Sequence, residues 1–89
     1  MFNAKDARRV SRVYLNKETK STIRRMEEAL RTCARAGLTK RRFDCEVMFS
    51  DVHCNKIAEH FSRHGYNVEW HIDEAFDHRI FEFDWSTAD

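Results

Sequence analysis

Apolar side chains recur every three or four positions through the first third of the chain, a spacing that predicts helix. Asn3 is a good N-cap residue, and Gly37 with a hydrophobic residue after it is typical of a helix C-terminus. The periodicity is interrupted from Asn16 to Ser21, where no strong apolar residue falls in register. The pattern therefore predicts either one helix over about 3–36 or two helices that meet near Asn16.

After this helical third the period changes to two, as in a strand with one buried face. Residues 43–49, 67–73 and 80–85 alternate in this way and are predicted to form strands. Between the first two lies a short helical pattern over 51–64, which again ends at a glycine followed by a hydrophobic residue. Residues 74–77 are the predicted hairpin connection between the last two strands.

These elements predict an α+β fold, with a long N-terminal helix, either continuous or divided in two, followed by a β-α-β-β unit. The helical crossover gives the first and second strands the same direction, and the third strand pairs antiparallel with the second. The third strand lies either at the edge of the sheet or between the other two. We expect a three-stranded mixed sheet with the helices on one face. The 89 residues are predicted to form one domain, with a basic helical segment at 1–38 and the β-α-β-β unit at 39–89.

The alternation assigns one face of the sheet to an aromatic core. Its predicted members are Phe43, Val47, Phe49, Val68, Trp70, Ile72, Phe81, Phe83 and Trp85. The helix pattern adds a predicted surface for self-association, since a helix of ~34 residues would be ~51 Å long and would either fold back or project and pair with another chain. The predicted oligomer contact consists of Val10, Val13, Tyr14, Ile23, Met26 and Leu30.

Charge is sorted along the chain. Residues 1–42 contain thirteen Lys and Arg and four acids, a net charge of +9, whereas residues 43–89 contain three Lys and Arg and eleven acids, a net charge of −8. The overall charge of +1 hides this asymmetry, which indicates a polyanionic partner or a polar self-assembly. Guanidinium groups suit phosphate. The candidate residues for binding phosphate or a partner are Arg8, Arg9, Arg12, Arg24, Arg25, Arg31 and Arg35.

The second face of the sheet is expected to be acidic almost throughout and to bind a basic partner. Its residues are Asp44, Glu46, Glu69, Asp73, Glu82 and Asp84. Two alternatives are simpler. The acidic face would only aid solubility and discourage edge-to-edge pairing, and the basic helix would be a solvated face, partly paired with the acidic sheet of the same or a neighbouring molecule.

Few residues offer chemistry. His60 and His64 are weak candidates for a metal site, because an i, i+4 pair can hold two ligand positions, but a solvated helix face is the alternative and no metal or other cofactor is predicted. Cys54 lies on the apolar stripe of its helix, which predicts a buried, unreactive thiol. The sequence contains no P-loop, GxSxG or zincin motif, so we expect no enzymatic activity.

No segment approaches the ~18 consecutive apolar residues of a membrane helix, and the N-terminus lacks the apolar centre of a signal peptide, so a cytoplasmic protein without membrane association is expected. Three cysteines without a CxxC spacing are typical of reduced thiols.

Three short segments resemble a group of small phage proteins that begin with Asn-Ala-Lys-acidic-Ala and contain Gly-Tyr-x-Val and a closing strand with Trp-Ser. The matching residues are 3–7 (NAKDA), 64–69 (HGYNVE) and 80–86 (IFEFDWS). The resemblance implies a viral origin, an α+β fold and a location in the host cytoplasm, and it carries over no catalytic residue.

The expected function is therefore that of a phage-type, non-enzymatic interaction protein. It would self-associate and bind a host protein or counteract a host process. One alternative is a binder of phosphate ligands, either nucleic acid or a small nucleotide, through the Arg-rich helix. Another is a small virion or assembly component.

Overall fold

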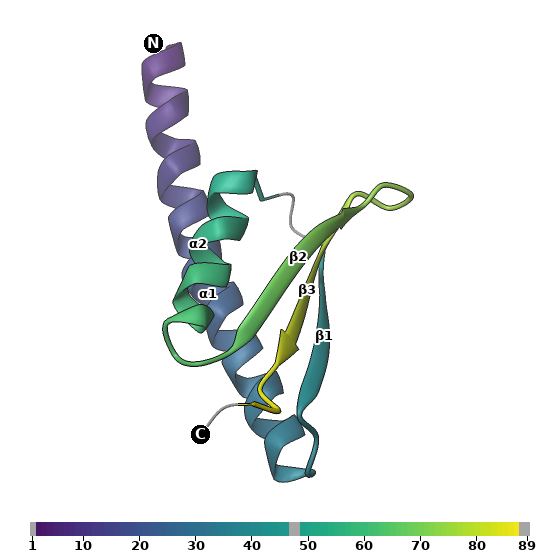
Figure 1. Cartoon of the computed structure of the whole chain (residues 1–89). Coiled ribbons are helices and arrows are strands. Elements are labelled where there is room, and N and C mark those ends of the chain that lie inside the picture. The colour runs from purple at the N-terminus through teal and green to yellow at the C-terminus, as the bar shows by residue number, and fades with distance from the viewer. Residues whose placement is uncertain (1, 47–48, 88–89) are drawn as a thin grey trace.

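The computed structural model describes residues 2–46 and 49–87. Over these residues the chain order is α1 (Ala4–Arg35), β1 (Lys40–Cys45), α2 (Asp51–Ser62), β2 (Asn67–Asp73) and β3 (His78–Asp84). Both helices lie on the same side of the sheet (Figure 1). The predicted α+β fold, with a long N-terminal helix and a β-α-β-β unit, is confirmed.

The first helix, α1, is continuous, which decides between the one-helix and two-helix predictions. Asn3 caps its N-terminus, since Asn3 Oδ1 accepts a hydrogen bond from Asp6 N at 3.0 Å. At the C-terminus Gly37 has a φ of +84°, and Leu38 N donates to Cys33 O at 3.0 Å. This is the Schellman arrangement, in which the left-handed glycine lets the chain reverse while the last carbonyls of the helix keep their partners.

The second helix, α2, begins and ends by the same means. Ser50 Oγ accepts a hydrogen bond from His53 N at 3.4 Å, as an N-cap side chain does. After the helix, Gly65 has a φ of +92° and Tyr66 N donates to Phe61 O at 3.2 Å. The Tyr66 ring then packs edge-on against Phe61, with the ring centroids 5.8 Å apart, which anchors the turn on the core.

The strand order is β1-β3-β2, and both pairs are antiparallel. Because β3 lies between β1 and β2, the sheet that was predicted as mixed contains only antiparallel pairs. The first strand begins earlier than the alternation predicts, at Lys40, and ends at Cys45. Phe49, which the alternation places in that strand, lies in the segment before α2 and is fully buried. Val47 lies outside the described residues.

The core lies between the helices and the inner face of the sheet. It contains Met26, Leu30, Cys45, Phe49, Cys54, Ile57, Phe61, Phe81 and Phe83. Four more of the predicted aromatic-face residues, Phe43, Val68, Trp70 and Trp85, are half-buried against this cluster. Ile72, near the end of β2, is 38 % exposed and only borders the core.

One buried residue breaks the alternation. The register places Ile80 between Asp44 and His71, which are both exposed on the outer face of the sheet. Ile80 is nevertheless only 1 % exposed. Its neighbours on the outer face therefore shield it from solvent, although no helix covers that face (Figure 1).

Candidate interaction surfaces

About half of α1 extends beyond the body of the protein (Figure 1). Among the side chains described for α1, the first that is buried is that of Thr19, and none of those described for residues 4–18 is buried. Fifteen residues of helix measure ~22 Å at 1.5 Å per residue, which is a large part of the 54 Å long axis of the molecule. Residues 4–18 are referred to below as the projecting half of α1.

Three apolar side chains lie together on the projecting half. Val10, Val13 and Tyr14 have the i, i+3, i+4 spacing that brings side chains onto one face, and they are 57 %, 63 % and 58 % exposed. They are referred to as the apolar stripe. Tyr14 and Ile23 are nine residues apart, about two and a half turns of helix, so their side chains point to opposite sides of α1. The apolar stripe therefore faces away from the side of α1 that packs on the core.

The predicted oligomer contact is thereby divided. Met26 and Leu30 are 0 % and 2 % exposed in the protein's own core, and Ile23 packs against that core. Met26 and Leu30 are thus removed from the predicted contact, whereas the apolar stripe stays accessible. The physical reason is the interruption between Asn16 and Ser21, which shifts the apolar positions to the opposite side of the helix.

A set of basic side chains occupies another face of the projecting half. Lys5, Arg8, Arg9 and Arg12 have i, i+3, i+4, i+7 spacing and are all exposed. Among residues 2–46 and 49–87, none of these four is in an ion pair. They are referred to as the basic stripe. Lys5 and Tyr14 are nine residues apart and point to opposite sides of α1. Arg9 and Val13 are four residues apart, so the basic and apolar stripes adjoin along one edge.

The other candidate arginines lie on the packed half of α1 and do not extend the basic stripe. One face of the packed half carries Arg24, Arg31 and Arg35. Arg24 is twelve residues from Arg12, so this face is rotated by about a third of a turn around the helix axis relative to Arg12 of the basic stripe. Arg31 is 3.4 Å from a glutamate one turn away, and Arg25 donates to a threonine hydroxyl at 3.2 Å. The structure therefore does not bring the seven predicted arginines into one site.

On the outer face of the sheet the predicted acids lie among bases. Five of the six predicted acids lie on this face according to the strand register: Asp44, Glu69, Asp73, Glu82 and Asp84. The sixth, Glu46, follows the end of β1. Lys40 and Arg42 lie on the same face, with Arg42 opposite Glu82. The expectation of an almost wholly acidic face is therefore wrong at this end of the sheet, because β1 begins earlier than the alternation predicts.

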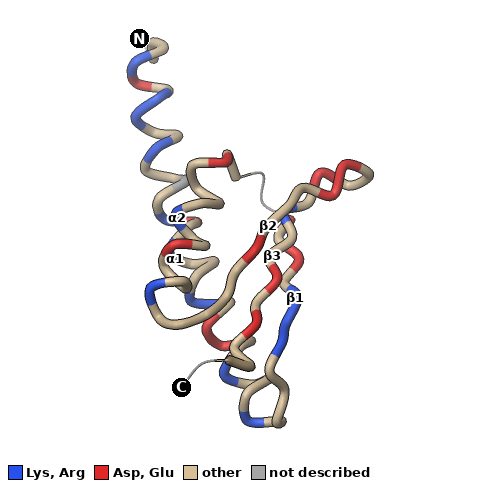
Figure 2. The backbone as a smooth tube through the Cα atoms, in the orientation of Figure 1, with Lys and Arg blue, Asp and Glu red and all other residues tan. Residues whose placement is uncertain are grey.

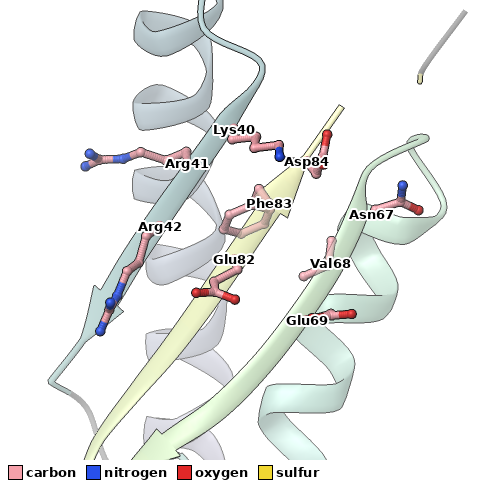
Figure 3. Close-up of a pocket in the computed structure, with 9 residues that line it drawn as sticks. All are labelled: Lys40, Arg41, Arg42, Asn67, Val68, Glu69, Glu82, Phe83 and Asp84. Carbon is pink, nitrogen blue, oxygen red and sulfur yellow. Dashed lines mark ion pairs between the residues drawn. The ribbon is translucent and has the colours of Figure 1, made fainter. Parts of the chain in front are cut away.

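A shallow depression of about 680 Å³ lies on this face, where β1 begins and β3 ends (Figure 3). Lys40 Nζ is 3.8 Å from Asp84 Oδ2. Asp84 Oδ1 accepts hydrogen bonds from the backbone N and the Oγ of Ser86, at 2.9 and 2.7 Å. These bonds hold the pKa of Asp84 below its ordinary value. Because both signs of charge line the depression, its chemistry favours neither a cation nor an anion.

The histidines of α2 are engaged within the protein. His60 Nε2 lies 3.2 Å from Glu27 Oε1 and so joins α2 to α1. His64 Nδ1 lies 2.7 Å from the His60 carbonyl oxygen, and the two rings are 4.9 Å apart. In the part of the chain that the structure describes, no group of three or more His, Cys, Asp or Glu side chains is arranged to hold a metal ion.

Cys54 is fully buried, as its place on the apolar stripe of α2 predicted. Burial raises the pKa of its thiol from 9.0 to about 11, because the charged thiolate is poorly solvated in the core. Cys54 is therefore a protonated thiol at neutral pH, the form that does not act as a nucleophile.

Comparison of the chain with protein-family models, with curated proteins and with solved structures gives no match. Among the helices of the described residues, neither is both long and apolar enough to cross a bilayer. The function has to be inferred from the geometry of the chain itself.

Proposed function

We propose that this protein is a non-enzymatic interaction protein that self-associates through the projecting half of α1. The observation that carries the proposal is the apolar stripe, whose three side chains are more than half exposed on a helix segment in which none of the described side chains is buried. Burial of apolar surface contributes ~25 cal/mol per Å². A second copy is the simplest partner, because a two-fold contact between identical stripes buries both at once.

The side chains that could carry chemistry support a structural role instead. The Cys54 thiol is buried and protonated, and His60 connects the two helices through Glu27. The resemblance to small phage proteins extends the proposal to an infected host cell, where a host protein would be a further partner of the projecting half.

Stacking of opposite charges end to end, as in an assembly component, receives less support. The basic projecting half and the acidic β2–β3 hairpin, which carries Asp73, Glu74 and Asp77, lie toward the same end of the molecule (Figure 2). A contact that brings like ends together favours a closed pair, whereas an open stack needs complementary surfaces at opposite ends.

The test is the molar mass in solution, measured by light scattering at ~100 µM because association depends on concentration. The wild type is expected to have the mass of a dimer or a larger oligomer. The triple variant Val10→Gln, Val13→Gln, Tyr14→Gln is expected to have the mass of one chain. Its free energy of unfolding, extrapolated to the monomer, is expected to change little because all three side chains lie outside the core.

A matched control replaces three apolar residues that are equally exposed elsewhere. Leu38, Val52 and Phe76 are 53 %, 61 % and 72 % exposed, and their triple Gln variant is expected to keep the wild-type mass. A wild type with the mass of one chain would contradict the proposal. An equal loss of mass in the control would also contradict it, because association would then be nonspecific and would involve exposed apolar surface in general.

A further inference from the structure

Lys5, Arg8 and Arg12 of the basic stripe lie on the side of the projecting half that is turned away from Val10 and Tyr14. We propose that the basic stripe binds the phosphate backbone of duplex DNA, with the projecting half of α1 in the major groove. The proposal does not depend on self-association, because the cations Lys5, Arg8 and Arg12 point away from Val10 and Tyr14 and stay accessible when those side chains are covered.

The charge of the stripe suits a polyanion. Within the described residues, Lys5, Arg8, Arg9 and Arg12 are exposed and form no ion pair, whereas Arg31 is paired with Glu28 at 3.4 Å. The stripe spans ~10.5 Å along the helix axis, and a duplex of that length presents about six phosphate charges. Three of the four cations are arginines, whose planar donors suit phosphate oxygens. The four cations would therefore neutralise about four of these six phosphate charges.

The composition of the stripe favours nucleic acid over an acidic protein. Protein interfaces are anchored by apolar and aromatic side chains at their centre. Of the exposed apolar side chains described on the projecting half, Val10 and Tyr14 lie on the other side of the helix, and Val13 lies at the edge of the basic stripe, four residues from Arg9. Contacts made by the cations hold the phosphate backbone and carry little sequence information.

The shape of the projecting half favours B-form DNA. An α-helix with its side chains is ~10–12 Å across, and the major groove of B-DNA is ~12 Å wide. The projecting half extends beyond the body of the protein (Figure 1), which leaves this part of α1 accessible to a groove. Lys5 and Ile23 are eighteen residues, or five turns, apart. The duplex would therefore approach on the same side of α1 as the packed residues, beyond the end of the body. The major groove of A-form RNA is deep and narrow and does not admit a helix in this way.

The charge on the remainder of the molecule limits where a DNA duplex can bind, and leaves the projecting half of α1 as its contact. Residues 43–89 have a net charge of −8, and their acids are seen along the sheet and at the β2–β3 hairpin (Figure 2). Phosphate is repelled from these surfaces. The duplex is therefore expected to contact α1 and to stay clear of the hairpin.

The experiment is a salt titration of binding to a fluorescein-labelled 20-base-pair DNA duplex, followed by fluorescence anisotropy. Four phosphate contacts predict a slope of about −3.6 in log K against log salt, and a loss of affinity on the order of 100-fold between about 50 and 200 mM salt. No binding by the wild type at the lower salt concentration would overturn the proposal.

Two charge-matched variants locate the site. Arg8→Gln, Arg9→Gln, Arg12→Gln removes three contacts and is expected to reduce the slope to about −1. Arg24→Gln, Arg31→Gln, Arg35→Gln makes the same change in net charge on the same helix but on another face, and is expected to keep the wild-type slope. An equal loss in the two variants would overturn the proposal, because net charge alone would then explain binding.

Three further measurements separate the ligand classes and the two stripes. A 20-base-pair RNA duplex and polyglutamate are both expected to bind at least about tenfold more weakly than the DNA duplex at equal salt, given the groove and backbone geometry. Equal affinity for either would overturn the assignment to B-form DNA. The triple Gln variant of the apolar stripe is expected to keep the salt slope per chain, and loss of DNA binding in that variant would overturn the assignment to the basic stripe alone.

Discussion

Arg79 Nε donates a hydrogen bond to the carbonyl oxygen of Phe49 at 2.9 Å. Arg79 lies on the inner face of β3, on the same side as the buried Phe81. The contact joins the central strand to the segment that leads into α2. A second guanidinium nitrogen of Arg79 is 2.8 Å from Asp77 Oδ1, and the Arg79 side chain is 11 % exposed. Its charge is thus neutralised and hydrogen-bonded at the border of the core.

Replacement of Arg79 by Met tests this contact. Met keeps most of the apolar stem but leaves the Phe49 carbonyl without its donor, so the free energy of unfolding is expected to fall by ~2–3 kcal/mol. Urea unfolding measures it. Arg63→Met is the control, because Arg63 pairs with Glu59 at the surface and is 74 % exposed, and it is expected to cost less than ~1 kcal/mol. Similar small losses in both variants would contradict the structural role of Arg79.

The division of α1 into a packed and a projecting half predicts that substitutions in the two halves have very different effects on the free energy of unfolding. Met26→Ala is expected to lower the free energy of unfolding by ~2–5 kcal/mol, since Met26 is fully buried and leaves a cavity. Val13→Ala is expected to change it by no more than ~0.5 kcal/mol in dilute protein, since Val13 is 63 % exposed. Urea unfolding of both variants is the measurement, and a comparable loss for Val13→Ala would contradict the division.

Most of the fold could be predicted from the sequence because its signals are local. The change of period from about 3.6 to two marks where helix gives way to strand, and each helix ends at a glycine followed by a hydrophobic residue. Gly37 and Gly65 both have positive φ in the structure. The antiparallel pairing of β2 and β3 follows from their short connection, since residues 74–77 are all in turns.

The face of α1 that packs on the core could not be predicted from apolar residues alone. Thr19 and Thr22 occupy core-facing positions in and beside the interruption, and both are buried. The Thr22 hydroxyl accepts a hydrogen bond from Arg25 at 3.2 Å, which satisfies it there. The packed side of α1 therefore contains two buried threonines, which an apolar pattern does not mark.

The candidate surfaces were predictable in part. The i, i+3, i+4, i+7 spacing of the basic stripe is present in the sequence, but the predicted site contains arginines alone and so omits Lys5. Lys40 and Arg42 were missed because a strand that begins with consecutive cations has no apolar alternation to mark it. Which arginines stand outside the body depends on tertiary packing, and no local pattern contains that information.

Asp84 and Ser86 form a local pair whose effect is measurable. The pKa of Asp84 is lowered, first by the backbone N of Ser86 and then by its hydroxyl. Ser86→Ala removes only the hydroxyl, so the pKa of Asp84 is expected to rise part of the way to its ordinary value. An NMR titration of the Asp84 side chain measures it, with Thr87→Ala as the control. An unchanged pKa in Ser86→Ala would show that the hydroxyl does not stabilise the carboxylate.

Cys54 couples the stability of the protein to alkaline pH. Burial raises the pKa of the thiol from 9.0 to about 11, so the folded protein keeps a proton that the unfolded chain releases. Between these two pH values the unfolded state binds fewer protons than the folded state, and the free energy of unfolding must fall as the pH rises. Below the lower value both states are protonated, and Cys54 gives no pH dependence.

The measurement is urea unfolding of the wild type and of Cys54→Ala across the range from neutral pH to about 10.5. Tyrosines and lysines also titrate in the alkaline part of this range, so the relevant quantity is the difference between the two proteins. That difference is expected to be constant up to about pH 8.5 and then to shift with rising pH in favour of Cys54→Ala, because only the wild type must hold a neutral thiol in the core. Parallel curves up to the highest pH would mean that the Cys54 thiolate is accommodated in the folded protein as well as in the unfolded chain.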